Sequence, residues 1–304
     1  MSTPSLRLGI DLGGTKIEAA LVDAQGTVVW RKRVATPRDD YAATLTVIHS
    51  LVQDARHDHP DAQNCSVGIG IPGSLSPRDG CVRNANSVWL NGQPLKADLE
   101  VRLGHAVSMA NDANCLARSE ATDGAGKGAA SVFAVILGTG VGGAHVVQGH
   151  LLIGANGIAG EWGHTPLPWM RHDEQHRPPC WCGRSGCIET FLSGPALIHE
   201  FNSMQPDPVS HVHTIVERAA SGDAAASQLL ERFYDRLARA LAMVITIVDP
   251  DVIVIGGGLS NITEMYSEVP RRWATWVFSD TPVTTRLVPA RHGDSSGVRG
   301  AAWL

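Results

Sequence analysis

The sequence lacks a long apolar run, a leader-like N-terminus and an excess of basic charge. No segment approaches about 20 apolar residues, and no basic stretch followed by an apolar core and a cleavage site opens the chain. We therefore expect a cytoplasmic protein. A formal net charge of −5 and a pI near 6.2 disfavour nucleic acid or an anionic membrane as its main partner. With 304 residues, the chain is long enough for two domains of ordinary size.

Two common nucleotide-binding signatures are also missing. The sequence contains no GxxxxGK[ST] P-loop. Residues 68–73 and 138–143 match GxGxxG, but Pro72 interrupts the first and strand-like alternation follows the second. A dinucleotide fingerprint needs a helix directly after the glycines. We therefore exclude that kind of site.

Cysteine is scarce, with six in the chain, and three of the six are clustered. The cluster comprises Cys180, Cys182 and Cys187, and Gly183 and Gly186 allow its backbone to curl so that the sulfurs face one point. His164, at the end of a Gly-rich segment upstream, is the best candidate for a fourth ligand. Three thiolates and one imidazole make a closed, structural zinc site, which leaves no position for a catalytic water and disfavours a zinc hydrolase. The alternative is three buried or redox-active cysteines with an unrelated histidine.

The other cysteines, at positions 65, 81 and 115, are scattered singly, which fits a reducing compartment. Two carboxylates flank the cluster. Glu161 precedes His164 by three residues, and Glu189 follows Cys187 by two. A metal that ties His164 to the cysteines would bring both glutamates together, where they could accept hydrogen bonds from the hydroxyls of a neutral polyol. Taken singly, each glutamate is better explained as a solvated surface residue.

The opening segment, from residue 6, predicts three short strands joined as hairpins. Its first turn follows Asp11 and consists of Gly13, Gly14, Thr15 and Lys16. The glycines allow backbone N–H groups to approach a phosphate, the threonine adds a hydroxyl and the lysine adds a charge. Asp11 could hold a magnesium ion through water. An ordinary glycine hairpin with a solvated lysine fits this segment equally well.

Residues 131–149 repeat the opening design of strand, Gly/Thr turn and strand, which indicates an internal duplication. The turn of this second copy contains Thr139 and Gly140. Farther along, a buried strand from residue 251 leads into three glycines and then a predicted helix. Gly257 and Gly258 would place backbone donors and a positive helix end where an adenosine or phosphate group could rest.

Asp112 stands between a predicted strand at 107–110 and a predicted helix at 113–121. An N-cap is a common and sufficient role for it, and position alone favours that role. The alternative is a base that takes a proton from a hydroxyl. An asparagine-rich loop with Trp89 lies upstream. It suits sugar binding and plain turns equally well.

Amphipathic helices are predicted at 41–57, 212–220 and 224–248, and a short helix is predicted at the end of the chain. Residues 165–179, rich in proline, histidine and charge, are predicted to form an exposed loop.

The two Gly/Thr turns, GEWGH at 160–164 and CWCGRSGC at 180–187 together resemble the ROK family of bacterial sugar kinases and repressors over essentially the whole chain. Within that family the sequence looks most like the fructokinase (manno(fructo)kinase) branch. The branch motifs are TPRDDY at 36–41, GIPGSLSP at 70–77, NANSVWLNGQPL at 84–95, NDANCLA at 111–117 and HGDSSGVRGAAWL at 292–304. The resemblance implies an actin-like, ribonuclease H-like ATPase fold with two α/β domains and a cleft between them. We expect one domain at 1–116 with the terminal helix at 293–304, and a larger domain at 117–292.

The resemblance also implies roles for individual residues. Asp112 would be the catalytic base in phosphoryl transfer from ATP. The hexose would be held by Asn86, Asn111, Asp112, Glu161, His164 and Glu189, with His164 binding zinc through its other ring nitrogen. The phosphates and a magnesium ion would lie against Asp11, Gly13, Gly14, Thr15, Lys16, Thr139 and Gly140, and the nucleotide would lie above Gly257 and Gly258.

The predicted reaction is ATP-dependent phosphorylation of the 6-hydroxyl of fructose, with mannose or glucose as further substrates. Glucokinase, mannokinase and N-acetylglucosamine kinase activities of the same family are the alternatives, because small differences in hydroxyl placement separate them. A repressor without catalysis is a further alternative, which the early first strand disfavours because it leaves no room for an N-terminal helix-turn-helix. A homodimer is expected, as is common in the family.

Overall fold

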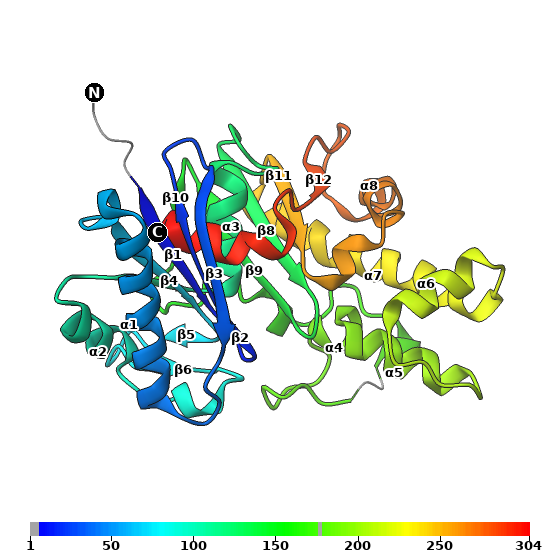
Figure 1. Ribbon diagram of the computed structural model, residues 1–304. Helices are drawn as coiled ribbons and strands as arrows, with labels where there is room; N and C mark the ends of the chain where they lie inside the picture. Colours follow the sequence, from blue (N-terminus) through cyan, green and yellow to red (C-terminus); the bar gives the residue numbers. More distant parts are fainter. Residues whose placement is uncertain (1–5, 176–177) are drawn as a thin grey trace. The chain divides into compact units, whose positions relative to one another are not determined.

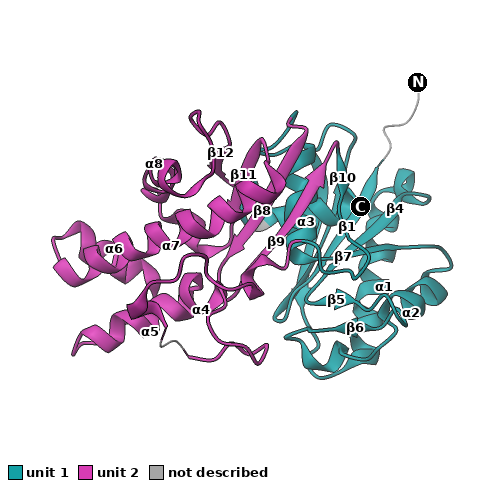
Figure 2. Ribbon diagram, turned by 180° about the vertical axis from the view of Figure 1, so that it is seen from behind, with its two compact units in different colours: residues 1–128, 149–159, 291–304 teal, residues 129–148, 160–290 magenta. Residues whose placement is uncertain are grey.

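The computed structural model describes residues 6–175 and 178–304, which pack as two compact units (Figures 1 and 2). Unit 1 contains the chain up to Gly128, the segment Gly149–Ala159 and the C-terminal segment Arg291–Leu304. Unit 2 contains Ala129–Gln148 and Gly160–Ala290. The α/β fold class expected from the sequence is confirmed. The domain division at residue 116 stays a prediction.

The sheet of unit 1 has the strand order β3-β2-β1-β4-β7. β1 (Arg7–Leu12), β2 (Lys16–Val22) and β3 (Val28–Ala35) are antiparallel neighbours, which confirms the predicted hairpins. β4 (Ser66–Ile71) and β7 (Ser108–Asn111) continue the sheet parallel to β1. Asp11 pairs with Gly70, and Ile71 pairs with Asn111. The carboxyl ends of these three strands therefore meet at one edge, which brings two predicted site segments together.

Helices cover both faces of this sheet. α1 (Tyr41–Asp58) packs apolar residues such as Ile48 against inward-facing strand residues such as Leu8. On the other face, α9 (Ser296–Ala302) lies against β1 and β4 (Figure 1). A Cβ atom at Gly9 or Gly68 would collide with the α9 backbone, so the glycines permit this close packing. Unit 1 also contains α2 (Leu95–Leu103), α3 (Asp112–Thr122), the 3-10 turns η1 (Pro60–Ala62), η2 (Val88–Leu90) and η6 (Gly293–Ser295), and the short strands β5 (Ser74–Leu75), β6 (Val82–Arg83) and β10 (His150–Leu151).

The sheet of unit 2 contains β9 (Val141–Val147), β8 (Ser131–Leu137), β11 (Val252–Gly256) and β12 (Arg286–Pro289), in that spatial order. β8 and β9 form the predicted second hairpin, and β11 lies parallel to β8 with Gly256 opposite Ile136. Two Gly-rich turns, at 138–140 and 257–258, therefore leave the same edge of the sheet. β9 is a strand, so the prediction that no helix opens at the glycines of 138–143 is confirmed.

The core of unit 2 is built around α7 (Ala224–Val248). Its N-cap is Asp223, which accepts the backbone N–H groups of Ala225 and Ala226. The remaining helices are α4 (Glu189–Leu192), α5 (Gly194–Met204), α6 (Val212–Ala220) and α8 (Met265–Trp276), so the predictions at 212–220 and 224–248 are confirmed. None of the helices in the described part of the chain has the length and apolar character needed to span a bilayer.

Two local predictions were wrong. The glycines after β11 lead into a 3-10 turn, η5 (Gly258–Asn261), and the expected helix begins only at Met265, because consecutive glycines disfavour regular helix. The segment 165–179 is not simply an exposed loop, although residues 176–177 lie outside the described part. It contains η4 (His172–Glu174), and Glu174 is 3% exposed because arginines of α7 bind it.

Candidate active site and metal cluster

The predicted base lies at the start of α3 in unit 1. Asn111, the last residue of β7, is the N-cap, and its side-chain oxygen accepts the backbone N–H of Asn114 at 2.7 Å. The expectation that Asp112 caps this helix was therefore wrong by one residue. Asp112 is the first helical residue, and its Oδ1 accepts the N–H of Ala113 at 2.8 Å. A carboxylate at this position also faces the positive end of the helix dipole.

The side chain of Asp112 is in contact with solvent, but many protein atoms lie in the wider region around its carboxylate. The resulting desolvation raises the pKa of Asp112 above its ordinary value, against the opposing effect of the backbone N–H groups. Desolvation also raises the pKa of Asp11 to about 6, and the charge of Asp112 is the next largest cause. Two neighbouring carboxylates, one of them reachable from solvent, thus share the carboxyl edge of the unit 1 sheet. A carboxylate with a raised pKa is a better proton acceptor, which suits a general base.

Two side chains fix the glycine turn between β1 and β2 by donating hydrogen bonds to its backbone carbonyl groups. The Gly13 oxygen accepts from Thr36 Oγ1 at 2.7 Å, and the Gly14 oxygen accepts from Arg38 Nε at 3.2 Å. The side chains of Thr15 and Lys16 are exposed, which leaves them accessible to an anion. Arg38 is a second cation at this turn that sequence reasoning missed. Its position a few residues after the end of β3 gave no indication of this contact.

Asn86 lies exposed in the loop that precedes η2. The loop is closed by Asn91, whose side chain both donates to and accepts from the backbone of Ala85 at 2.9 Å. A Cβ atom at Gly14 would lie 3.5 Å from Ser87 Oγ, so this loop runs beside the glycine turn. The structure therefore places Asn86 in the same part of unit 1 as the turn.

In unit 2, the four predicted metal ligands converge. One ring nitrogen of His164 and the three cysteine sulfurs all lie within 4.8 Å of one another. His164 Nδ1 lies 3.5 Å from the Sγ of Cys180, and the sulfurs of Cys182 and Cys187 are 3.7 Å apart. A tetrahedron with ordinary zinc bond lengths has edges of about 3.6 Å between nitrogen and sulfur and about 3.8 Å between sulfurs. These two distances match the edges of a zinc tetrahedron, and the four ligand atoms lie close enough together to surround one ion.

The backbone of the cluster explains the need for its glycines. Gly183 and Gly186 adopt φ values of +85° and +77°, which side-chain-bearing residues rarely adopt. Hydrogen bonds from Leu167 N–H to the Gly186 oxygen and from Ile188 N–H to the Thr165 oxygen, each 2.9 Å, tie the histidine segment to the cysteine loop. The backbone N–H of Arg184 lowers the pKa of the Cys182 thiol to about 7, and burial raises the pKa of the Cys187 thiol to about 12.

Glu189 begins α4, next to the cluster. Its Oε2 accepts the backbone N–H of Val141 at 2.9 Å, and its Oε1 accepts the indole Nε1–H of Trp181 at 2.8 Å. A Cβ atom at Gly140 would lie 2.7 Å from Oε2, so a side chain there would displace the carboxylate. Glu161 is exposed and precedes the 3-10 turn η3 (Trp162–His164). The structure thus brings Glu189, Gly140 and the ligand cluster together, and places Glu161 in the same turn as His164.

A cavity of about 770 Å³ lies within unit 2 beside the two Gly-rich turns. Its lining includes Thr139 and Gly258, two of the predicted nucleotide residues. Gly257, with φ of +83°, packs against the Leu137 backbone and does not line the cavity. The other walls come from α5 and α6 and include Pro195, Ile198, Val212 and Val216. Sequence reasoning missed His211 and His213, whose rings stack 5.2 Å apart at the start of α6 and also line the cavity.

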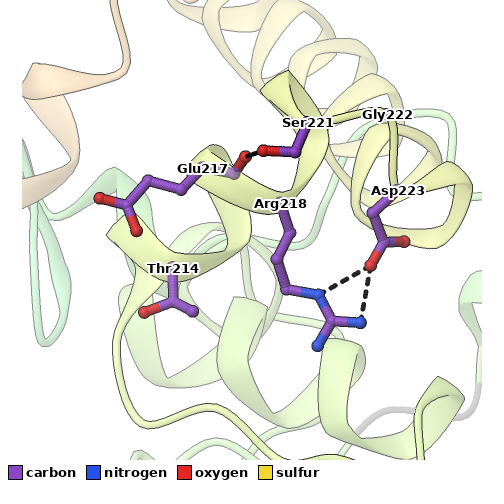
Figure 3. A pocket seen from close by; sticks show the side chains of 6 residues that line it. All are labelled: Thr214, Glu217, Arg218, Ser221, Gly222 and Asp223. Atoms are coloured by element: carbon purple, nitrogen blue, oxygen red, sulfur yellow. Dashed lines mark hydrogen bonds and ion pairs between the residues drawn. The ribbon is translucent and has the colours of Figure 1, made fainter.

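A second hollow, of about 450 Å³, lies at the end of α6 (Figure 3). It is lined by Thr214, Glu217, Arg218, Ser221, Gly222 and Asp223. Arg218 forms an ion pair of 2.7 Å with Asp223, the cap of α7, so these two charges already satisfy each other. None of the predicted site residues lies here.

Known proteins resemble this chain over almost its whole length. The sequence model of the ROK family matches residues 7–304. The N-acetyl-D-glucosamine kinase of Photobacterium profundum is 41% identical over 304 residues, which cover 97% of this chain and 98% of that protein. The enzyme of the same name from Vibrio cholerae serotype O1 is 42% identical over 302 residues, with the same coverage.

Among solved structures, the ROK hexokinase from Thermus thermophilus superposes with a TM-score of 0.84 at 29% identity, covering 98% of this chain and 97% of that chain. A ROK family glucokinase from Streptomyces griseus, in complex with glucose and AMPPNP, superposes with a TM-score of 0.74 at 29% identity and covers 98% of both chains.

Proposed function

The chain belongs to the ROK family and is a sugar kinase of it, and we propose that it transfers a phosphoryl group from ATP to the 6-hydroxyl of N-acetyl-D-glucosamine. The choice of sugar rests on two relatives that are 41–42% identical over 97% of the chain, both of which are N-acetyl-D-glucosamine kinases. The fructose predicted from branch motifs has no support among these relatives. They favour N-acetylglucosamine, which the sequence had left as an alternative.

Asp112 is the proposed general base. It is reachable from solvent, its pKa is raised, and one of its oxygens is fixed by the Ala113 N–H. A fixed carboxylate can accept the proton of a sugar hydroxyl as that hydroxyl attacks the γ-phosphate, a contribution of roughly 10²–10⁴-fold. Asn111, whose side chain is held by the Asn114 N–H, keeps the start of α3 in place beside it. The protein otherwise contributes to catalysis by aligning the sugar hydroxyl with the γ-phosphate of ATP.

Asp11, Thr15 and Lys16 would face the phosphates. Two neighbouring carboxylates at one sheet edge, with the pKa of Asp11 raised to about 6, form a donor set that suits a magnesium ion. Asp11 would hold that ion, which offsets phosphate charge when bound. The exposed hydroxyl of Thr15 and ammonium group of Lys16 supply further phosphate contacts, and Arg38 adds a cation next to Gly14.

The cavity of unit 2 is the proposed nucleotide site. The backbone N–H groups of Thr139 and Gly258 are the proposed donors for phosphate, and the apolar residues of α5 and α6 would provide a surface for the base. The glucokinase that shares this fold at 29% identity was solved with AMPPNP, which supports ATP as the donor.

Glu189, Glu161 and His164 are the proposed sugar contacts of unit 2. The four-ligand cluster fits a structural zinc ion, which would fix the cysteine loop and the ring of His164. With Nδ1 facing the cluster, Nε2 is the ring nitrogen that remains to meet a hydroxyl. We also expect a cytoplasmic homodimer, a state that light scattering would test.

The product identifies the reaction. Incubation with magnesium-ATP and N-acetyl-D-glucosamine should yield one ADP per sugar phosphate, and phosphorus-coupled NMR should place the ester on O6. An ester on another oxygen would contradict the proposed geometry, and ADP release without a sugar ester would contradict the activity.

A further inference from the structure

Trp181 combines two properties that rarely occur together. Its side chain is fixed, yet Trp181 is 69% exposed. The residue lies between two members of the ligand cluster, Cys180 and Cys182, so its backbone cannot move independently of them. A large aromatic side chain stabilises a fold mainly through burial of its apolar surface. Trp181 buries little of that surface, so it contributes little to stability in this way.

Two contacts hold the indole in one orientation. Its Nε1–H donates to Glu189 Oε1 at 2.8 Å, and its ring meets the ring of His164 at a centroid distance of 4.9 Å and an angle of 88°. The perpendicular contact with His164 covers one part of the indole, and the hydrogen bond uses its only polar atom. What remains exposed is therefore apolar ring surface, held rigidly next to the carboxylate of Glu189.

A rigid, exposed aromatic face beside a hydroxyl-binding carboxylate is suited to a sugar. The indole is already fixed in one orientation without the ligand. Binding therefore does not have to offset the entropy of ordering this side chain, which favours affinity. A sugar whose hydroxyl reaches Glu189 brings its ring C–H groups and neighbouring substituents to the indole. An acetamido group offers a methyl group and a planar amide to pack on the ring, whereas a hydroxyl at the same carbon offers neither.

We propose that Trp181 is a substrate-contacting residue that favours N-acetylated hexoses, with its indole face packing on the acetamido group of the sugar bound at Glu189. The proposal rests on the function proposed above, since it takes Glu189 as a sugar ligand. It assigns a role to a residue of the cysteine loop that does not itself bind the metal.

The test compares Trp181→Ala and Trp181→Phe with the wild type. Loss of the ring in Trp181→Ala should raise the KM for N-acetyl-D-glucosamine about tenfold, with kcat changed less than twofold and a smaller effect on the KM for glucose. Trp181→Phe keeps an aromatic face but loses the N–H, so its KM should rise only about two- to threefold. Equal losses in the two variants would show that the indole merely positions Glu189 through Nε1, which would overturn the proposal.

Trp169 is the matched control. It is 54% exposed in the same unit but packs on Trp276, with ring centroids 5.4 Å apart. Trp169→Ala should leave both KM values within twofold. Adding N-acetyl-D-glucosamine without ATP should change tryptophan fluorescence in the wild type and in Trp169→Phe, but not in Trp181→Phe. Equal zinc content in all variants would confirm that the loop is intact.

The outcomes separate the two proposals. If the wild type phosphorylates N-acetyl-D-glucosamine and Trp181→Ala has an unchanged KM and fluorescence response, the role of Trp181 is wrong and the proposed function stands. If the wild type fails to phosphorylate this sugar, the proposed function falls, and the role of Trp181 falls with it.

Discussion

Arg239 donates two hydrogen bonds to the carboxylate of Glu174, at 3.0 Å and 2.7 Å, and both side chains are buried. The same guanidinium donates to the backbone oxygens of Pro168 and Trp169, and Arg236 donates to Glu174 at 2.8 Å. Helix α7 thereby holds the segment that follows His164. That segment is bonded on its other side to the cysteine loop. The arginines of α7 therefore support the metal cluster without touching it.

We predict that Glu174→Gln lowers the free energy of unfolding at pH 7 by about 1.5–3 kcal/mol, because it removes a buried carboxylate from Arg236 and Arg239. The two arginines keep Glu200 and Asp235 as partners, which limits the loss. Urea unfolding would measure the loss. Glu231→Gln is the control. Glu231 also pairs with an arginine, Arg272, at 2.6 Å, but its side chain is 62% exposed, so its loss should cost less than about 1 kcal/mol.

The loss at Glu174 should depend on pH. Burial alone would raise the pKa of Glu174, but hydrogen bonds from Arg239, the Arg171 N–H and Arg236 outweigh burial and lower that pKa to about 2. A carboxyl group with a folded-state pKa below its unfolded value of 4.5 stabilises the fold above pH 4.5. That contribution is lost as the pH falls towards 2. The difference between wild type and Glu174→Gln should thus shrink between pH 4.5 and pH 2, and a difference that stays constant would contradict this ion network.

Zinc is predicted to bind at one ion per chain through His164 and the three cysteines. Elemental analysis of protein purified without added metal should give a ratio near one, and Cys182→Ser should lose most of the metal. Chelation should lower the melting temperature, because the closed site contributes folding free energy. Cys65→Ser, outside the cluster, is the control and should keep its zinc. Metal-free wild type with unchanged melting and sugar binding would contradict the role of the cluster.

Gly258→Val should impair ATP binding selectively. A Cβ atom at Gly258 meets no other atom within 4 Å, so the fold should accept a side chain, which would occupy part of the proposed nucleotide cavity. We expect the KM for ATP to rise at least tenfold and the KM for the sugar to change less than twofold. Ser221→Val adds similar bulk to the hollow at the end of α6 (Figure 3) and should leave both values unchanged. An unaltered KM for ATP in Gly258→Val would place the nucleotide elsewhere.

Asp112→Asn should separate binding from turnover. The amide keeps the size of the side chain and an oxygen for the Ala113 N–H, but it cannot accept the hydroxyl proton. Turnover should fall by roughly 10²–10⁴-fold. Calorimetry should show sugar affinity within a few-fold of the wild type, and melting should be little changed. Turnover above one tenth of the wild-type rate would remove Asp112 from the role of base.

The features that sequence reasoning predicted correctly are those encoded locally. The cysteine spacing and the left-handed conformations of Gly183 and Gly186 bring the three cysteines together within eight residues, and the Gly/Thr turns define both hairpins. The cap at Asn111 was misassigned by one residue because Asn and Asp are both good caps, and only the backbone shows where the helix begins.

The features that it missed depend on contacts between distant segments. Glu174 lies in a polar stretch that looks solvated, and its burial follows from Arg236 and Arg239, more than 60 residues later. The partner of Trp181 is closer in sequence, but the direction of the indole follows from the curl of the metal loop. The choice of sugar is the least accessible to sequence reasoning. A carboxylate can accept a hydrogen bond from a hydroxyl of any hexose, so the predicted carboxylates do not distinguish one hexose from another.

The most direct test of the account is a coupled ADP-release assay with magnesium-ATP and separate samples of N-acetyl-D-glucosamine, glucose, mannose and fructose. We predict the highest kcat/KM for N-acetyl-D-glucosamine, at least tenfold above each of the others. A higher value for fructose or another hexose would keep the kinase and contradict its proposed substrate. Absence of sugar-dependent ADP release with all four would contradict the account of the active site itself.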